Sequence, residues 1–181
     1  MKDFSLPSFY LGLLVLLLLI AAVLLFRQVI KTRRTESTFS RLQNKLTKQR
    51  GTAQEYYELG SIYLDKKLYS QSITLLKKAL KSKDLEGAEN IALIHNALGY
   101  AYACQEQYDS AIRQYKEALE QTPEYVVALN NLGFAYEKKQ LITQAVEAYE
   151  KAFAIDPKDS TAQRRAESLR KRIAAPANSE R

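Results

Sequence analysis

A short pattern, Leu-Gly-x-x-Tyr, occurs three times in the chain and constrains its fold more than any other feature. The copies are residues 59–63, 98–102 and 132–136. Gly133 follows Gly99 at the same interval along the chain as Ala152 follows Ala118. Self-similarity at a fixed period indicates a repeat architecture, in which each unit buries its apolar face against its neighbours.

The residue types at the recurring positions predict two closely packed helices in each repeat. Gly and Ala recur where a larger side chain would hold the helix backbones apart, and Leu and Tyr recur at the spacing of one apolar helix face. Proline is expected to end the second helix of a pair, because its ring clashes with the preceding turn. The expected packing residues are Leu59, Gly60, Tyr63, Ala79, Leu98, Gly99, Tyr102, Ala111, Ala118, Pro123, Leu132, Gly133, Tyr136, Ala145, Ala152 and Pro157.

These positions resemble the tetratricopeptide repeat, a helix–turn–helix unit of about 34 residues. On that alignment the three repeats are 53–86, 92–125 and 126–159. The resemblance implies an all-α fold, a right-handed superhelical α-solenoid of three helix pairs over residues 52–159. Two features depart from the pattern. Asp84 stands where the first repeat would carry Pro, and the Gly that normally opens the turn is replaced by Lys67, Glu106 and Gln140.

The first two repeats are spaced differently from the last two. Gly60 and Gly99 lie five positions further apart than Gly99 and Gly133, a surplus over the repeat period. Either the first helix of the second repeat gains about a turn, or the preceding loop lengthens, and Gly87 marks the expected break.

Both ends of such an array need caps. Residues 52–55, Thr-Ala-Gln-Glu, fit a capping box at the start of the first helix. Residues 160–175 are predicted to form a C-terminal capping helix with Ala162, Ala166, Leu169 and Ile173 on one side, followed by a disordered tail over 176–181.

An uncharged run from Phe9 to Phe26 predicts one transmembrane helix ahead of the repeats. A helix of that length spans roughly 27 Å, close to the hydrocarbon thickness of a bilayer. With the residues that follow, the anchor is expected to cover 9–30, after a short segment over 1–8. A cleaved signal peptide is the alternative, but the run is longer than an h-region and is not followed by a small-residue cleavage site.

A basic segment follows the apolar run. Residues 27–50 hold eight Lys or Arg and one acidic residue, which accounts for the whole net charge of +7. A nucleic-acid binder would carry a basic face on its folded body, so no nucleic-acid partner is expected. Residues 31–51 are predicted to form a basic juxtamembrane helix or linker. Within it, residues 36–50 either pack against the first repeat or continue the membrane helix.

The position of these basic residues predicts the topology. Positive residues stay on the cytoplasmic side of a membrane, so the C-terminal domain is expected in the cytosol or in the stroma of a plastid. The same residues can attract anionic lipid headgroups. The topology determinants are Arg27, Lys31, Arg33 and Arg34.

The sequence carries no signature of an enzyme or of a metal site. No P-loop, dinucleotide-binding or nucleophile-elbow motif occurs. Cys104 and His95 are the single residues of their types. His95 is expected to be a packed core residue, and Cys104 an inert small residue near the concave edge. We therefore expect no catalytic residue, no metal and no cofactor.

Tetratricopeptide repeats bind proteins, and the resemblance implies a binding groove lined by the first helix of each pair. Tyr57, Tyr100 and Phe134 place large rings there, and the amides of Asn96 and Asn130 could bond a ligand backbone. The alternative is that the rings pack on the next repeat and the amides are hydrated. The expected groove residues are Tyr57, Ser61, Leu93, Asn96, Tyr100, Val127, Asn130 and Phe134.

The whole architecture resembles the photosystem I assembly proteins of cyanobacteria and algal plastids: one N-terminal membrane helix, a basic segment and three tetratricopeptide repeats. The resemblance implies a thylakoid anchor and protein partners that are photosystem I subunits or assembly factors, with lipid contacted through the N-terminal helix. The alternative is a bacterial membrane-anchored adaptor for envelope or secretion complexes, and a third class is an accessory domain of an enzyme. The sequence sets no oligomeric state.

Overall fold

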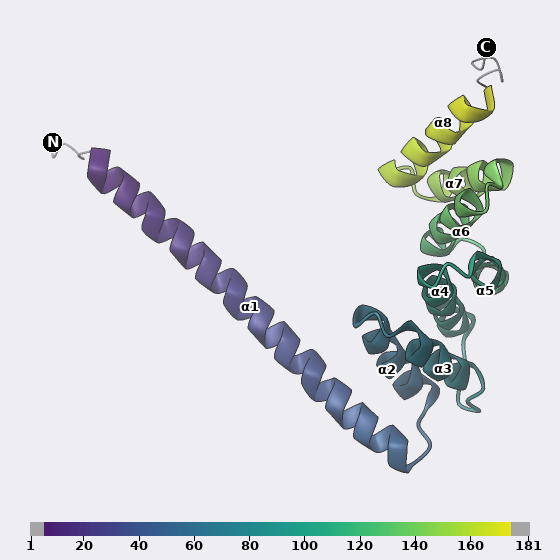
Figure 1. Cartoon of the computed structure of the whole chain (residues 1–181), viewed down its shortest axis with the longest axis horizontal. Helices are drawn as coiled ribbons and strands as arrows, with labels where there is room; N and C mark the ends of the chain where they lie inside the picture. The colour runs from purple at the N-terminus through teal and green to yellow at the C-terminus, as the bar shows by residue number, and fades with distance from the viewer. Residues whose placement is uncertain (1–5, 175–181) are drawn as a thin grey trace. The chain divides into compact units, whose positions relative to one another are not determined.

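The computed structural model describes residues 6–174, and within that range it contains eight α-helices and no strand (Figure 1). The helices are α1 (Leu6–Lys48), α2 (Ala53–Asp65), α3 (Tyr69–Leu80), α4 (Ala88–Cys104), α5 (Tyr108–Gln121), α6 (Val126–Lys138), α7 (Ile142–Ile155) and α8 (Ser160–Ala174). The all-α fold class is confirmed. The expected tail over 176–181 and most of the segment over 1–8 lie outside the described residues.

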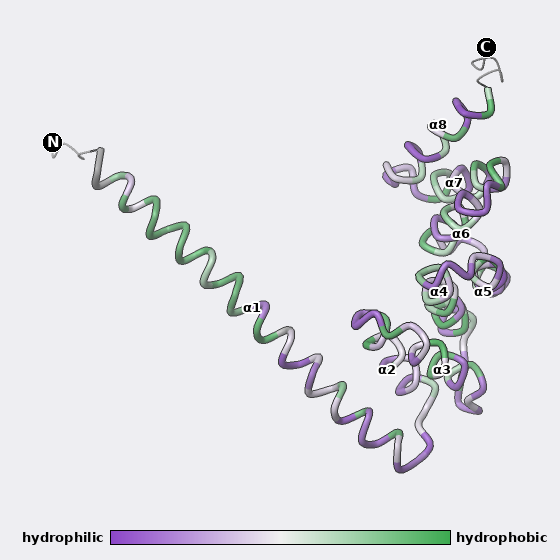
Figure 2. Tube along the Cα trace, in the orientation of Figure 1, coloured by the Kyte–Doolittle hydropathy of each residue, from purple (hydrophilic) through white to green (hydrophobic). Residues whose placement is uncertain are grey.

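The chain divides into two units, Met1–Thr47 and Lys48–Arg181. The first unit is α1, one unbroken helix of 43 residues that runs through the apolar run and most of the basic segment. The basic residues therefore continue the apolar helix. Figure 2 shows the change along α1 from hydrophobic to hydrophilic residues.

The apolar part of α1 is long and apolar enough to cross a membrane. An 18-residue window of the helix has a mean hydropathy of 3.0, and none of that window is buried by protein. Side chains from Phe9 to Phe26 are exposed to the surroundings. A helix that is apolar all round and has no protein cover is typical of a membrane span.

The second unit is built from helix pairs. The pairs α2–α3, α4–α5 and α6–α7 pack internally, successive pairs contact through α3–α4 and α5–α6, and α8 packs on α7. Tyr115 and Leu76 are among the largest fully buried side chains of the described residues, and each comes from the second helix of its pair. The core thus runs along the array as a series of interfaces between neighbouring helices.

The turn inside each pair uses a left-handed residue that is not glycine. These residues are Lys67, Glu106 and Gln140, with φ of 59°, 59° and 61°. In the first turn the N–H of Leu68 donates to the carbonyl of Tyr63 (2.8 Å) and the N–H of Lys67 donates to that of Leu64 (2.9 Å). This is a Schellman motif, and the other two turns repeat it. The three positions are those where the repeat pattern normally has Gly.

Proline changes how the second helix of a pair ends. Thr122 and Asp156, which precede Pro123 and Pro157, are extended, with φ of −139° and −120°. Lys81 ends α3 without a following proline and stays in the helical region, with φ −93° and ψ 0°. The difference follows from the clash between a proline ring and the preceding residue, which disfavours the helical region there.

The surplus between the first two repeats is taken up mainly by a longer helix. α4 has 17 residues, whereas α2 and α6 have 13 each. It starts immediately after Gly87, whose φ of 85° suits glycine. Of the two alternatives left open by the sequence, the first helix of the second repeat therefore gains a turn.

The two ends of the array are capped by side chains. At α2 the predicted capping box is confirmed: Thr52 Oγ1 accepts from the N–H of Glu55 and Glu55 Oε2 accepts from the N–H of Thr52, both at 3.2 Å. At α8, Asp159 Oδ1 accepts from the N–H of Ala162 at 3.0 Å. Of the residues expected on the packed side of α8, Ile173 is exposed, because it lies in the last turn and no described helix covers it.

Candidate protein-binding face

Four large apolar side chains are exposed on the first helices of the second and third pairs. They are Leu93 (39% exposed) and Tyr100 (48%) on α4, and Val127 (52%) and Phe134 (38%) on α6. Within each helix the two residues are seven apart, a step that returns to the same side of a helix. We call these four residues the apolar row. All four were expected in the binding groove.

The two asparagines expected to contact a ligand are bonded within the chain. Asn96 Nδ2 donates to Tyr125 Oη (3.4 Å), and Asn96 Oδ1 accepts from Asn131 Nδ2 (3.0 Å). Asn130 Nδ2 donates to Asp159 Oδ2. Each amide thus donates one hydrogen bond that links its helix to a segment further along the chain. Asn130 Oδ1 is buried and has no hydrogen-bond partner among the described residues.

The expected groove residues of α2 are less exposed than those of the apolar row: Tyr57 and Ser61 are half-buried. Tyr57 borders a cavity of about 180 Å³ between α2, the α3–α4 loop and the start of α4. The lining residues are Ala53, Gln54, Tyr57, Asp84, Leu85, Glu86, Asn90, Leu93 and Ile94. Leu93 therefore belongs both to this cavity and to the apolar row. In the sequence, the cavity was indicated only by the five additional residues between Gly60 and Gly99.

Charged side chains flank the other end of the apolar row. Arg165 Nη1 of α8 forms an ion pair with Glu137 Oε1 of α6 at 3.1 Å. Lys138 Nζ lies 5.4 Å from the centre of the Phe134 ring, a cation–π contact. Arg172 is exposed seven residues after Arg165, on the same side of α8.

Cys104 and His95, both on α4, have neighbouring side chains as partners. The side chain of Cys104 raises the pKa of the hydroxyls of Tyr69 and Tyr100, chiefly through side-chain hydrogen bonding. His95 Nδ1 lies 3.0 Å from Gln114 Oε1 on α5. Among the described residues no group of three or more His, Cys, Asp or Glu side chains could hold a metal ion.

The expected packing residues lie mainly between the helices of each pair. Gly60, Gly99 and Gly133 are buried, as are the Leu and Ala positions, and Tyr63, Tyr102 and Tyr136 are half-buried. Pro123 and Pro157 are exposed in the connections after α5 and α7.

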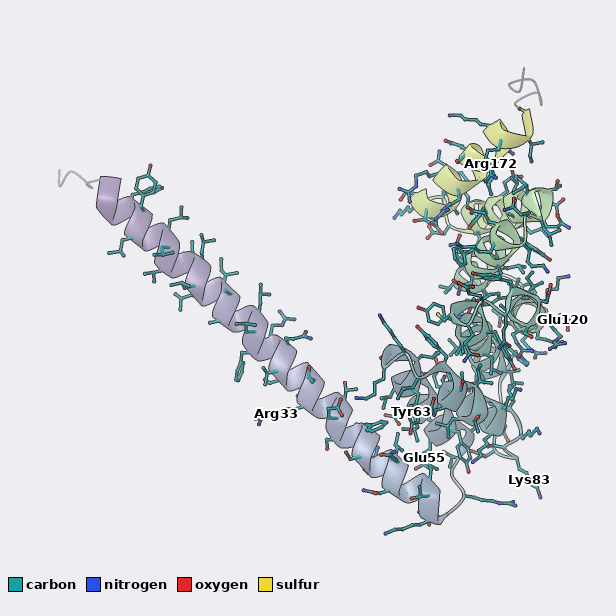
Figure 3. The ribbon with its side chains drawn as sticks, in the orientation of Figure 1. Arg33, Glu55, Tyr63, Lys83, Glu120 and Arg172 are labelled. Carbon is teal, nitrogen blue, oxygen red and sulfur yellow. The ribbon has the colours of Figure 1, made fainter. Side chains whose placement is uncertain are left out.

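The residues expected to set the topology lie on α1. Arg27, Arg33 and Arg34 are exposed, and Figure 3 shows Arg33 projecting from the helix. The side chain of Lys31 lies outside the described side chains.

Comparison with known proteins identifies the repeats. A family model described as "TPR repeat" matches residues 99–140. Two models described as "Tetratricopeptide repeat" match residues 53–84 and 126–159. The ycf37 protein of Cyanophora paradoxa is 36% identical over 163 residues, covering 90% of this chain and 94% of that protein. The ycf37 protein of Guillardia theta is 34% identical over 129 residues, covering 71% and 72%.

A plant relative is longer than this chain. The "Tetratricopeptide repeat domain-containing protein PYG7, chloroplastic" of Arabidopsis thaliana is 33% identical over 171 residues, which cover 94% of this chain and 56% of that protein. Among solved structures, MamA matches with a TM-score of 0.69 at 25% identity, covering 78% of this chain and 82% of MamA. The first TPR domain of Spaghetti (RPAP3) matches with a TM-score of 0.62 at 18% identity, covering 68% and 94%, a likeness of fold alone.

Proposed function

The chain belongs to the ycf37 family of tetratricopeptide-repeat proteins, and we propose that it is a membrane-anchored scaffold that binds other proteins and performs no catalysis. The observation that carries the proposal is the apolar row. Leu93, Tyr100, Val127 and Phe134 are each more than a third exposed. Large apolar side chains gathered on one surface favour a protein interface, and aromatic residues there tend to dominate the binding free energy.

The proposed binding surface runs along α2, α4 and α6, with Tyr57 and Ser61 at its α2 end. The rings of Tyr100 and Phe134 are its anchors. The amides of Asn96 and Asn130 contribute by fixing each helix relative to the next segment, because each already donates one hydrogen bond inside the chain. A partner that lies on this surface would therefore meet a preformed face, which reduces the entropy lost on binding.

We propose further that the partners are photosystem I subunits or assembly factors and that the membrane is the thylakoid. Three observations support this: the match to ycf37 proteins over nearly the whole chain, a relative whose name says that it is chloroplastic, and the combination of one apolar helix with three repeats. The chain would hold its partners while a complex is assembled, on the cytosolic or stromal side of the membrane.

Affinity capture tests the proposal. The full chain with a C-terminal tag is expressed in its own host, the membranes are solubilised in mild detergent, and captured proteins are quantified against an unrelated single-span bait. We expect photosystem I subunits or their assembly factors to be enriched. Enrichment of envelope or secretion proteins instead would support the bacterial adaptor, and absence of photosystem I proteins would refute the proposed partners.

A further inference from the structure

Among the described residues, one hydrogen bond that recurs in the second and third repeats has no counterpart at the same positions of the first repeat. In the second and third repeats, a side chain reaches the residue 29 positions later: Asn96 contacts Tyr125 and Asn130 contacts Asp159. The equivalent residues of the first repeat are Tyr57 and Glu86. There the cavity of about 180 Å³ lies in place of a bridge, and both residues are among its lining.

The walls of the cavity combine apolar, amide and acidic groups. Tyr57, Leu85 and Leu93 give it apolar surface, and two carboxylates, Asp84 and Glu86, lie at its loop side. No lysine or arginine is among the lining residues. Lys83 of the same loop is exposed and points away from the helices in Figure 3. The cavity is therefore acidic and amphipathic.

One of the carboxylates is held in place by the fold. Asp84 Oδ2 accepts a hydrogen bond from the N–H of Ala53 at 3.0 Å, across 31 residues of sequence. This bond attaches the loop to the start of α2, where the helix dipole also favours an anion. The carboxylate of Asp84 thus stays at the cavity wall in the absence of a ligand.

The size and chemistry of the cavity favour one side chain over a small molecule. Ligand sites for drug-sized molecules are usually about 300–1,000 Å³, and this cavity is smaller. A long basic side chain matches it, because its methylene groups can lie on Tyr57 and Leu93 while its charged end meets the carboxylates.

We propose that the cavity receives a lysine or arginine side chain of the protein segment that lies on the apolar row. The inference rests on the proposed function and adds the chemistry of the partner. Leu93 lines both surfaces, so one continuous segment can contact both. The segment carries a basic residue at its α2 end, followed by apolar side chains that meet Tyr100, Val127 and Phe134.

Charge at the other end of the row gives the segment a direction. Lys138 lies over Phe134, and Arg165 and Arg172 lie on one side of α8, with Glu137 paired to Arg165. These four side chains together carry a net positive charge, opposite in sign to the two carboxylates of the cavity. Complementary charges fix the orientation of a partner more than they add affinity, so the α8 end is suited to an acidic or neutral part of the segment.

The test uses the tagged full chain in detergent-solubilised membranes and measures the amount of each captured protein. The variants are Glu86→Gln and Asp84→Asn, which keep an oxygen acceptor but remove the charge. Glu89→Gln is the matched control, because Glu89 is exposed on the first turn of α4 and does not line the cavity. We expect Glu86→Gln and Asp84→Asn to lower capture about threefold at low salt, less at high salt, and the control to have no effect.

A photo-crosslinking amino acid at Gln54, a residue that lines the cavity, identifies what enters it. We expect the cross-linked partner peptide to contain a lysine or arginine within a few residues of the adduct. A peptide without a basic residue, or a peptide from the basic segment 27–50 of a second copy of the chain, would overturn the proposal.

A double variant, Tyr100→Ala with Phe134→Ala, separates this proposal from the proposed function. If capture depends on the two rings but not on Asp84 or Glu86, the binding face stands and the cavity proposal is wrong. If capture depends on neither, both are wrong. A thermal melt of each variant, followed by circular dichroism, confirms that the repeats remain folded.

Discussion

The ring of Tyr115 fills the space that a side chain on Gly99 would need. A Cβ atom built on Gly99 would lie 2.5 Å from Tyr115 Cε1, closer than real Cβ contacts. The equivalent distance from Gly133 to Tyr149 Cε1 is 2.9 Å, and from Gly60 to Leu76 Cδ2 it is 3.1 Å. The close approach of α4 and α5 therefore depends on the absence of one methyl group.

Gly99 and Gly60 should respond to alanine to different extents. Gly99→Ala is expected to destabilise the repeats by about 1–3 kcal/mol, because a buried aromatic ring must move. Gly60→Ala should cost less, since the contact is with the flexible end of Leu76 and alanine favours the helix by about 1 kcal/mol over glycine. Thermal melts of the variants measure the order. Equal shifts in Tm for both variants would contradict it.

Replacing the left-handed turn residues by glycine should stabilise the repeats. A residue other than Gly in that region costs about 1–2 kcal/mol, and part of the gain from replacing it is offset by the larger entropy of Gly in the unfolded chain. Lys67→Gly, Glu106→Gly and Gln140→Gly should thus each stabilise the repeats by about 0.5–1 kcal/mol. The control is Lys66→Gly, at φ −80°, which should not stabilise. Chemical denaturation of each variant tests the difference.

Asp159 predicts a pH dependence at the C-terminal cap. Hydrogen bonds from the N–H of Ala162, from Asn130 and from the N–H of Thr161 hold the pKa of this carboxyl below its ordinary value, although partial burial opposes them. A lowered pKa in the folded state means that the stabilisation is present above the pKa of the unfolded chain, about 3.9, and is lost as the pH falls through the folded value.

Asp159→Ala should therefore destabilise α8 by about 1 kcal/mol at neutral pH, the usual cost of losing a cap. The difference from the wild type should shrink as the pH is lowered below about 4. Hydrogen exchange of the α8 amides at several pH values measures this. A difference independent of pH would show that the charge of Asp159 is not what stabilises the cap.

The apolar row predicts loss of binding without loss of folding. Tyr100→Ala and Phe134→Ala should each weaken partner binding by about 1–2 kcal/mol, a typical value for aromatic anchors. Leu141→Ala is a suitable control, because Leu141 is 36% exposed but precedes α7 and is not in the row. Binding is followed with the captured partner, and helicity by circular dichroism. An equal loss of binding in the control would indicate non-specific binding to exposed apolar side chains.

The topology is open to a direct test. If the basic residues after the apolar run stay on the cytosolic or stromal side, protease added to that side should digest the repeats. Protease confined to the opposite side should leave them intact. Replacing Arg27, Arg33 and Arg34 by Gln should reduce the fraction of correctly oriented chains, as measured by the same assay.

Much of the fold could be predicted because its signals are local and periodic. The capping box at Thr52 depends on residues three apart. The spacing between Gly60 and Gly99 predicted surplus residues, but only the structure shows that they lengthen α4 by a turn. The departures at Lys67, Glu106 and Gln140 were visible as missing glycines. The sequence did not tell whether the turn itself would change, and the structure keeps it left-handed at all three.

The site was less predictable because its bonds join residues far apart. The exposed rings follow from the helix period, but the partners of Asn96 and Asn130 lie 29 residues later, beyond any local pattern. Both amides were therefore interpreted as available to a ligand. The exposure of Ile173 was missed for a related reason: helical spacing gives the side of a helix but not the extent of the neighbour that covers it.

The length of α4 decides how this array could be rebuilt. The second and third repeats have the same length. Inserting a second copy of residues 126–159 would therefore lengthen the array by one repeat without changing the spacing between the existing repeats. The first repeat contacts the second through α4, whose additional turn begins after Gly87. A repeat inserted after the first one without this turn would therefore not reproduce the junction that α4 forms.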